Sequence, residues 1–238
     1  MKTSAAAVDR SPASIGAEAV REGVKDAFPI VLGYIPLGFA FGVLARAHGL
    51  SPLWATLMSV LIYSGSGQFI AVGLMGLGAS PWTIVLTAVA VNIRYLLLSA
   101  SLAARLTALP RRFLWLYAFQ LTDETFAVAS DRLRREQPQP HYLWGLNLAA
   151  HLSWIGGTLA GAAFGGALPA TERWGIDFAL PAMFISLVVG QCRRREDVLV
   201  ALAAAGLTLL VSGLGGDGFS LPLAAAAAAL LGVILSRE

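Results

Sequence analysis

Eight apolar stretches, most of them long enough to cross a lipid bilayer, follow one another along this 238-residue chain. A spanning helix needs about 20 apolar residues to cross a hydrocarbon core of about 30 Å, and charged or turn-forming residues separate the stretches. The sequence predicts an all-α polytopic membrane protein with eight transmembrane helices, or seven if one stretch does not cross. The predicted spans are Phe28–Ala47, Leu53–Leu77, Trp82–Ala104, Phe113–Ser130, Tyr142–Leu168, Phe178–Cys192, Val198–Leu214 and Phe219–Leu235.

Composition favours the same class of protein. Apolar residues make up 57% of the chain and charged residues 13%, whereas about 25% of the residues in a soluble domain are charged. The formal charge of +3 does not indicate nucleic-acid binding, because a basic excess in a membrane protein marks its cytoplasmic loops. The single cysteine, Cys192, excludes an intramolecular disulfide.

The predicted domain organisation is simple. Residues 1–27 are polar and mixed in charge, which predicts a cytosolic N-terminal tail with a short amphipathic helix at about Ser14–Asp26. Residues 28–236 form a single transmembrane domain surrounded by the lipid bilayer. The segment Phe178–Cys192 is short and contains Pro181, so a tilted, broken or re-entrant helix is expected there.

The distribution of lysine and arginine predicts an orientation with the N-terminus inside. With eight spans, eleven basic residues fall on the cytoplasmic side and five outside: Arg46, Arg105, Arg111, Arg112 and Arg173. The stretch RLTALPRR at 105–112 disagrees with this orientation because three of the five belong to it. If that stretch is also cytoplasmic, one earlier segment does not cross, which is the seven-span alternative.

A faint internal repeat is visible at residues 28–104 and 113–192. Each unit holds three apolar segments with a long, glycine-rich segment in the middle. An odd number of spans per unit places two such units in opposite orientations, as in the inverted 3+3 repeats of secondary transporters. Two C-terminal helices would follow the repeat. The alternative is that glycine-rich membrane helices resemble one another by composition alone.

The stretch YSGSGQF at 63–69 interrupts the second apolar segment. An unwound turn survives in a membrane only where protein or a water-filled cavity surrounds it, and glycines tolerate the backbone angles of such a turn. A half-helix that begins near Gly67 would aim its amide groups at an anionic ligand such as a carboxylate. The candidate substrate-binding residues are Ser64, Gly65, Ser66, Gly67 and Gln68. The alternative is a face of small residues for close helix packing.

Proline and glycine give the first span a similar character. Pro36 lies in the middle of GYIPLGFAFG, so a kink or break is expected, and Pro36 joins the candidate substrate-binding residues. Gly38 and Gly42 form a GxxxG pair, which indicates close packing against another helix.

Ionisable residues inside apolar segments are the strongest functional signal in the chain, because such residues are functional by default. Asn92 and Arg94 lie in the third predicted span, and Asp123 and Glu124 in the fourth. One carboxylate would neutralise Arg94, and the other would bind a substrate ammonium group or carry a proton. Asn92 is a further candidate for substrate binding. The alternative is an ion pair with a structural role only.

His151 in the fifth span is a candidate proton relay, because its unperturbed pKa of about 6.5 lies near neutrality. A histidine that is hydrogen-bonded between helices is the equally well supported alternative. Motifs of metalloproteases, hydrolases, nucleotide-binding loops and redox cysteines are missing, so neither enzymatic activity nor a metal or other cofactor is expected. Without a nucleotide-binding loop, ion gradients would drive any transport.

Four motifs in order, GYIPLGFAFGVLA, YSGSGQF, NIRYLLL and TDETFAV, resemble those of the AzlC family of branched-chain amino acid transport proteins. The resemblance extends over roughly residues 20–235. It implies the large subunit of a bacterial inner-membrane exporter for leucine, isoleucine, valine and sometimes methionine, completed by a small membrane partner of the AzlD type. It brings no established set of binding residues.

The functional expectation is therefore a secondary transporter that exports small hydrophobic amino acids and is coupled to protons. Two other classes compete with it. A passive channel for a small solute would need a continuous polar lining rather than an occluded site. A scaffold subunit without transport activity would use its intramembrane charges only to bind a partner.

Overall fold

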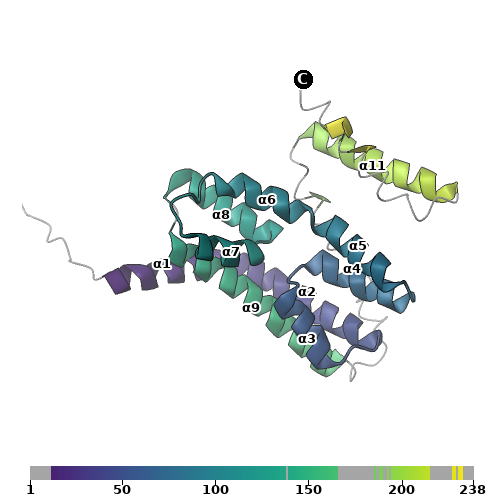
Figure 1. Cartoon of the computed structure of the whole chain (residues 1–238), viewed down its shortest axis with the longest axis horizontal. Helices are drawn as coiled ribbons and strands as arrows, with labels where there is room; N and C mark the ends of the chain where they lie inside the picture. The colour runs from purple at the N-terminus through teal and green to yellow at the C-terminus, as the bar shows by residue number, and fades with distance from the viewer. Residues whose placement is uncertain are drawn as a thin grey trace, which may run out of the picture. The chain divides into compact units, whose positions relative to one another are not determined.

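The computed structural model describes residues 12–137, 139–165 and 194–214, together with 185, 188, 189, 192, 227, 228 and 230–232 (Figure 1). The chain divides into two compact units, residues 1–180 and 181–238. The described residues contain ten helices and no strand, in agreement with the predicted all-α class. The helices of the first unit are α1 Pro12–Asp26, α2 Phe28–Ala47, α3 Pro52–Leu61, α4 Gly65–Gly76, α5 Pro81–Asn92, α6 Arg94–Ala103, α7 Arg111–Phe119, α8 Asp123–Arg135 and α9 Pro140–Phe164.

Helices α1 and α2 follow each other almost without interruption and run along α9 (Figure 1). Glycines allow the backbones to approach so closely that a Cβ atom at Gly38 would lie 2.7 Å from the carbonyl oxygen of Trp154. The close approaches are Gly23 to Tyr142, Gly38 to Trp154, and Gly42 to Thr158. Because residue numbers rise together in the two partners, α1–α2 and α9 are parallel. The predicted GxxxG packing at Gly38 and Gly42 is confirmed.

Helices α3 and α4 form a hairpin whose two outer ends both lie beside the C-terminal end of α2. The turn after α2 bends back, with the Leu50 amide bonded to the Ala45 carbonyl, and α3 begins two residues later. At the other end of the hairpin, Gly76 lies against the side chain of His48, the C-cap residue of α2. The predicted span Leu53–Leu77 is therefore interrupted at residues 62–64, and its two ends lie together instead of at opposite ends of the helix bundle.

Helices α7 and α8 form a second hairpin, which enters from the opposite end of α9. Phe113, near the start of α7, packs edge-on against Trp144 at 6.1 Å between ring centroids. Near the end of α8, the guanidinium of Arg132 lies 4.7 Å from the ring centroid of Tyr142. Both outer ends therefore lie beside the first turns of α9. The predicted span Phe113–Ser130 is wrong as one helix, because residues 120–122 break it and the chain doubles back.

Helices α5 and α6 connect the two hairpins. They meet at Ile93, whose backbone stays in the right-handed helical region, and together they form an apolar rod over residues 81–103 with a mean hydropathy of 1.7. Helix α5 packs against α4 and α6 packs against α8, so the rod runs from one end of the bundle to the other. This rod and α2, with a mean hydropathy of 2.0, are the two described segments long and apolar enough to cross a membrane by length and composition.

Other expectations have mixed outcomes. The predicted amphipathic helix at the N-terminus is confirmed as α1, and it packs on α9. The alternative of a break at Pro36 is wrong, since α2 continues through it, and a kink stays a prediction. The predicted repeat also stays a prediction: its two middle segments differ, one being the α3–α4 hairpin and the other the continuous α9.

The second unit contains α11, Arg195–Gly213, where the sequence predicts the span Val198–Leu214. The amide of Arg194 donates a hydrogen bond of 2.9 Å to the carboxylate of Asp197 and caps this helix. Most of the predicted spans Phe178–Cys192 and Phe219–Leu235 lie outside the described residues.

Candidate substrate site between two helix breaks

The tips of the two hairpins are helix starts in the middle of the bundle. Ser64 is the N-cap of α4 and accepts a hydrogen bond of 3.2 Å from the Gly67 amide. Thr122 is the N-cap of α8 and forms a capping box with Thr125. A helix start carries unpaired amide groups and a partial positive charge. The break predicted in YSGSGQF is thus confirmed, although α4 begins at Gly65 rather than near Gly67.

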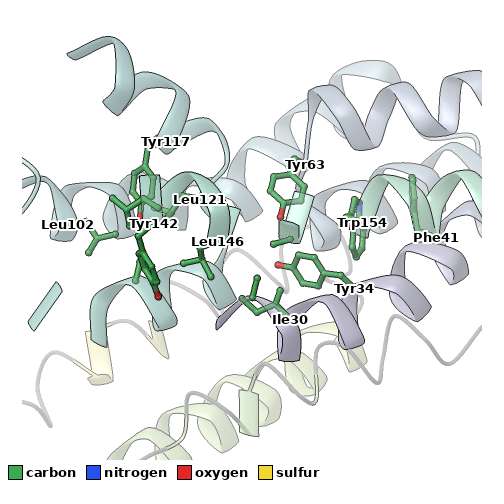
Figure 2. Close-up of a cluster of buried hydrophobic side chains, with 14 of the residues drawn as sticks. Ile30, Tyr34, Phe41, Tyr63, Leu102, Tyr117, Leu121, Tyr142, Leu146 and Trp154 are labelled. Atoms are coloured by element: carbon green, nitrogen blue, oxygen red, sulfur yellow. The ribbon is translucent and has the colours of Figure 1, made fainter. Parts of the chain in front are cut away.

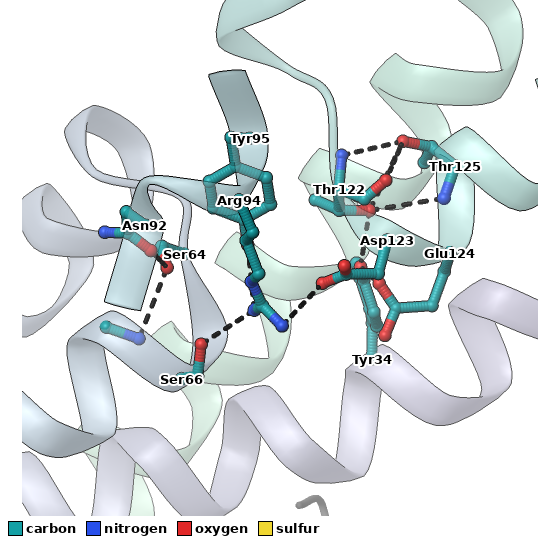
Figure 3. Close-up of polar contacts among 11 residues, drawn as sticks. Tyr34, Ser64, Ser66, Asn92, Arg94, Tyr95, Thr122, Asp123, Glu124 and Thr125 are labelled. Atoms are coloured by element: carbon teal, nitrogen blue, oxygen red, sulfur yellow. Dashed lines mark hydrogen bonds and ion pairs between the residues drawn. The ribbon is translucent and has the colours of Figure 1, made fainter. Parts of the chain in front are cut away.

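Arg94 joins the two tips (Figure 3). Its guanidinium lies 3.1 Å from a carboxylate oxygen of Asp123 on α8 and donates a hydrogen bond of 2.8 Å to the Ser66 hydroxyl on α4. The predicted pairing of Arg94 with a carboxylate is therefore present, and the carboxylate is that of Asp123. The side chains of Arg94 and Asp123 keep 28% and 23% of their surface exposed, so the ion pair is partly open to its surroundings.

Asn92 supports the first tip from the end of α5. The Ser64 hydroxyl donates a hydrogen bond of 2.5 Å to its carboxamide oxygen. Gly67 faces the same contact: an added Cβ atom would lie 2.8 Å from the Ser64 hydroxyl oxygen and 2.9 Å from the Asn92 carboxamide nitrogen. The second glycine of the motif is therefore needed for space.

Glu124, the second carboxylate, is bonded to a tyrosine rather than to Arg94 within the described part of the chain. The Tyr34 hydroxyl on α2 donates a hydrogen bond of 2.5 Å to the Glu124 carboxylate, and it lies 2.8 Å from the Thr122 hydroxyl. This arrangement ties the second hairpin tip to α2. Asp123 is thus paired with a cation, whereas its neighbour Glu124 accepts a hydrogen bond from a neutral hydroxyl.

Gln68 belongs to a buried polar network rather than to the open part of the site. Its carboxamide donates a hydrogen bond of 2.9 Å to the Ser59 hydroxyl and accepts one of 3.0 Å from the Trp154 indole. The Ser59 hydroxyl also pairs with the Thr158 hydroxyl at 2.8 Å. These bonds connect α3, α4 and α9, and they satisfy polar groups that would be costly to leave unpaired in an apolar interior.

His151 lies at the level of both tips, but its two ring nitrogens already have partners. Nε2 lies 3.1 Å from the Ser59 carbonyl oxygen, which can only accept, so this nitrogen carries the proton. Nδ1 then accepts from the Gln120 carboxamide nitrogen at 3.4 Å. This bonding favours the structural alternative for His151 over the proton relay.

The structure brings together nine of the predicted site residues, and it places Pro36 apart. Pro36 is exposed on α2, while the nearby Tyr34 is buried. The residues brought together around the tips and their supporting network are Ser64, Ser66, Gly67, Gln68, Asn92, Arg94, Asp123, Glu124 and His151. Gly65 opens α4, and a Cβ atom there would lie 3.1 Å from the Trp154 ring.

Sequence reasoning missed Tyr34, Thr122 and Trp154. A signal existed for Thr122, because threonine followed by two acidic residues and a second threonine is a typical helix start. Tyr34 and Trp154 lie in apolar helices without a local signal, and their edge-to-face contact, at 5.4 Å between ring centroids, exists only in the folded chain.

A chain whose described residues form helices without strands, with apolar segments and an arginine–carboxylate centre between two helix breaks, has the features of a helical membrane protein. This chain belongs to the AzlC family: the family model described as AzlC protein matches residues 29–168. Inner membrane protein YgaZ of Escherichia coli K12 is 36% identical over 92% of this chain and 90% of its own length.

Two further relatives are similar over most of the chain. An uncharacterized membrane protein of Archaeoglobus fulgidus is 34% identical over 74% of this chain and 77% of its own length. The branched-chain amino acid transport protein AzlC of Bacillus subtilis is 28% identical over 91% of this chain and 84% of its own length. No solved structure gives a significant match. The chain is thus a membrane protein of a family associated with transport rather than catalysis.

Proposed function

We propose that this protein is a secondary transporter that exports branched-chain amino acids across the bacterial inner membrane, with proton coupling. The substrates would be leucine, isoleucine and valine, and methionine as a further small apolar amino acid. The name of the Bacillus subtilis relative supports the substrate class, and the name of the Escherichia coli relative supports the location.

The observation that carries the proposal is the meeting of two hairpin tips that enter from opposite ends of the bundle. Each tip reaches the centre from one end, and Arg94 links them through Asp123 and Ser66. Separation of one tip would expose the centre to one side of the membrane while the other tip stays closed. That is the geometry required for alternating access to a central site.

The polar groups of the centre match the two ends of an amino acid. The start of α4, with Ser64, Ser66 and Gly67, offers amide and hydroxyl groups to the substrate carboxylate. Glu124, held by the Tyr34 hydroxyl, would accept the ammonium group. Asp123 or Glu124 would carry the coupling proton, because the protonated form of a carboxyl needs no cation beside it.

A small membrane subunit of the AzlD type is the proposed partner. Helices α5 and α6 support this proposal, since their apolar side chains face outward and need lipid or another helix to cover them. Exposed examples are Leu86, Val89, Leu96 and Leu97.

The two hairpins also support a revised membrane topology in which α3–α4 and α7–α8 are re-entrant. Loop 105–112 would then lie on the cytoplasmic side with the N-terminal tail. Apart from Arg94 in the centre, only two basic residues, Arg46 and Arg173, would then lie on the outer side of the membrane. This resolves the disagreement between RLTALPRR and the positive-inside rule. Two of the eight predicted spans, 53–77 and 113–130, would then not cross, so six would remain, one fewer than in the seven-span alternative.

Cysteine labelling in intact cells distinguishes this topology from eight alternating spans. In a Cys192→Ser background, we expect Lys25→Cys and Thr107→Cys to react only from the cytoplasmic side, and Ser80→Cys only from outside. Eight alternating spans require the opposite result at both Thr107 and Ser80, with Lys25→Cys as the common reference. Thr107 and Ser80 are exposed, so the reagent can reach them.

Export of labelled leucine tests the proposed function. Cells preloaded with leucine should release it faster when they contain this protein together with a candidate small subunit, and collapse of the proton gradient should slow the release. The matched control is an Asp123→Asn/Glu124→Gln double variant, which keeps the size of both side chains. Leucine release at the same rate with and without a proton gradient would support the passive channel. Normal leucine export by the double variant would support the scaffold alternative.

A further inference from the structure

Four buried polar atoms near the meeting point of the hairpins have no hydrogen-bond partner within the described part of the chain. They are Nε of Arg94, whose other two nitrogens are paired, the Tyr63 hydroxyl oxygen, and the carboxamide nitrogen and oxygen of Asn147. The last three atoms belong to residues that are buried almost completely, with 3% of the surface of Tyr63 and 1% of that of Asn147 exposed. A buried polar group without a partner carries its full desolvation penalty, and such groups in native proteins call for a specific reason.

Tyr63 and Asn147 are neighbours of His151. The Tyr63 ring stacks on the His151 ring at 3.9 Å between centroids. Asn147 lies four residues before His151 on α9, so the two side chains share one face of the helix. Both nitrogens of His151 are already bonded, so among the described residues the unpaired hydrogen-bonding atoms beside this ring are those of Asn147 and Tyr63.

Tyr63 also connects this region to the two hairpin tips. It directly precedes Ser64, the N-cap of α4, and its backbone is held at a φ of 41°, a left-handed conformation that is uncommon for a residue with a side chain. Its ring contacts that of Tyr34, the partner of Glu124, at 6.5 Å between centroids. In Figure 2 the Tyr63 hydroxyl points toward Tyr34, and the Tyr34 hydroxyl points to the side on which Ile30 and Leu146 are drawn.

We infer that Asn147 and Tyr63 form a second, inner position for the zwitterionic head group of the amino acid substrate, beyond the start of α4 and Glu124, an inference that rests on the proposed function. A carboxamide has a donor and an acceptor side by side. Its nitrogen would donate to the substrate carboxylate, and its oxygen would accept from the substrate ammonium. The Tyr63 hydroxyl adds a bond to the carboxylate, and the apolar side chains of Ile30 and Leu146 suit an aliphatic substrate.

This assignment makes the site specific for free α-amino acids. A ligand without the ammonium group would leave the Asn147 oxygen unpaired, and a ligand without the carboxylate would leave the nitrogen unpaired. Sites built to hydrogen-bond a substrate group discriminate strongly against analogues that lack it. Because the three atoms of Asn147 and Tyr63 are sealed from the surface, a substrate would reach them only after one hairpin tip has moved.

The first test replaces Asn147 with leucine in the full chain, purified and reconstituted into proteoliposomes. We expect the KM for leucine to rise about 10- to 100-fold, which is the loss expected for hydrogen bonds to charged groups. We also expect the substrate-free variant to melt at a higher temperature than the wild type, because leucine buries no unpaired polar atom. If Asn147 had only a structural role, the Asn147→Leu variant would melt at a lower temperature than the wild type.

A matched pair of tyrosine variants provides the second test. Tyr63→Phe and Tyr117→Phe each remove one buried hydroxyl that has no partner among the described residues. Tyr117 lies on α7 against Phe113, apart from Tyr63 in Figure 2. We expect the KM for leucine to rise for Tyr63→Phe and to stay unchanged for Tyr117→Phe. This pair decides the question even if Asn147→Leu does not fold.

Competition with labelled leucine completes the experiment. In the wild type, 3-methylbutylamine and 4-methylpentanoate, each lacking one charged group, should compete far less well than valine. If the wild type transports leucine while Asn147→Leu and Tyr63→Phe keep its KM, the inference is wrong and the proposed function stands. If the wild type with its partner transports no amino acid, both are wrong.

Discussion

Arg94→Met is expected to lower leucine export about 100-fold, equivalent to about 3 kcal/mol at the transition state. The guanidinium of Arg94 is the group that links the tips of the two hairpins, through Asp123 on one side and Ser66 on the other. Methionine keeps much of the length but removes the charge, so Asp123 loses its counterion beside Glu124. Initial rates of leucine efflux from preloaded cells, normalised to the amount of protein in the membrane, measure the effect.

The effect of Arg94→Met on stability should be smaller than its effect on transport. Removing one partner of a fully buried ion pair costs about 3–5 kcal/mol, but both side chains keep about a quarter of their surface exposed. We therefore expect a loss of about 1–2 kcal/mol in the free energy of unfolding in detergent. The double variant Arg94→Met/Asp123→Asn should recover that stability without recovering export.

Arg46→Met serves as the matched control for Arg94. Arg46 lies near the end of α2, where its guanidinium bonds the carbonyl of Leu50 in the following turn. Its removal should change export less than about twofold, because exposed polar contacts contribute little. Wild-type export by Arg94→Met would contradict the assigned role of the ion pair between the hairpin tips.

Gly42→Ala is expected to destabilise the protein by about 3 kcal/mol, at the upper end of the range for overpacking. A Cβ atom at this position would overlap the Thr158 carbonyl and would lie 2.5 Å from the Ala162 amide nitrogen. Backbone atoms of α9 cannot move aside as a flexible side chain can, so α2 and α9 must separate. Thermal unfolding of the purified protein in detergent measures the loss, and export should fall with the amount of folded protein.

Gly33→Ala on the same helix is the control for Gly42→Ala. No atom lies within 4 Å of the Cβ position at Gly33, and alanine is favoured over glycine in a helix by about 0.5–1 kcal/mol. We expect this variant to be as stable as the wild type or slightly more so. Equal losses in the two variants would show that helix flexibility, and not the α2–α9 contact, accounts for the effect.

Local chemistry explains which parts of the centre were predictable. YSGSGQF predicts its own helix break because glycines and a serine N-cap act within a few residues of one another, and the structure confirms the break. The capping box at Thr122 gives a similar local signal for the second break, but the apolar character of Phe113–Ser130 concealed it. The pairing of Arg94 with a carboxylate was predictable because an isolated charge in an apolar interior needs a partner.

It was harder to predict that the segments 53–77 and 113–130 double back as helical hairpins instead of forming single helices. Hydropathy reports only that a segment is apolar over a sufficient length, and a helical hairpin satisfies that condition as well as a single spanning helix does. The indirect signal was the basic stretch at 105–112, which conflicted with eight alternating spans. That conflict disappears when loop 105–112 lies on the same side as the N-terminal tail, as the arrangement of α7, α8 and α9 favours.

By itself, the sequence determined the helical membrane class, a helix break within YSGSGQF and the need for a counterion at Arg94, because each depends on composition or on residues close together in the chain. Tertiary structure alone decided that two breaks some sixty residues apart meet, and that Tyr34 binds Glu124 from a third helix. It also left Asn147 and Tyr63 unpaired. The physical reason is that burial and hydrogen-bond partners in this centre come from separate helices, whose alignment depends on the close glycine contacts of α1 and α2 with α9.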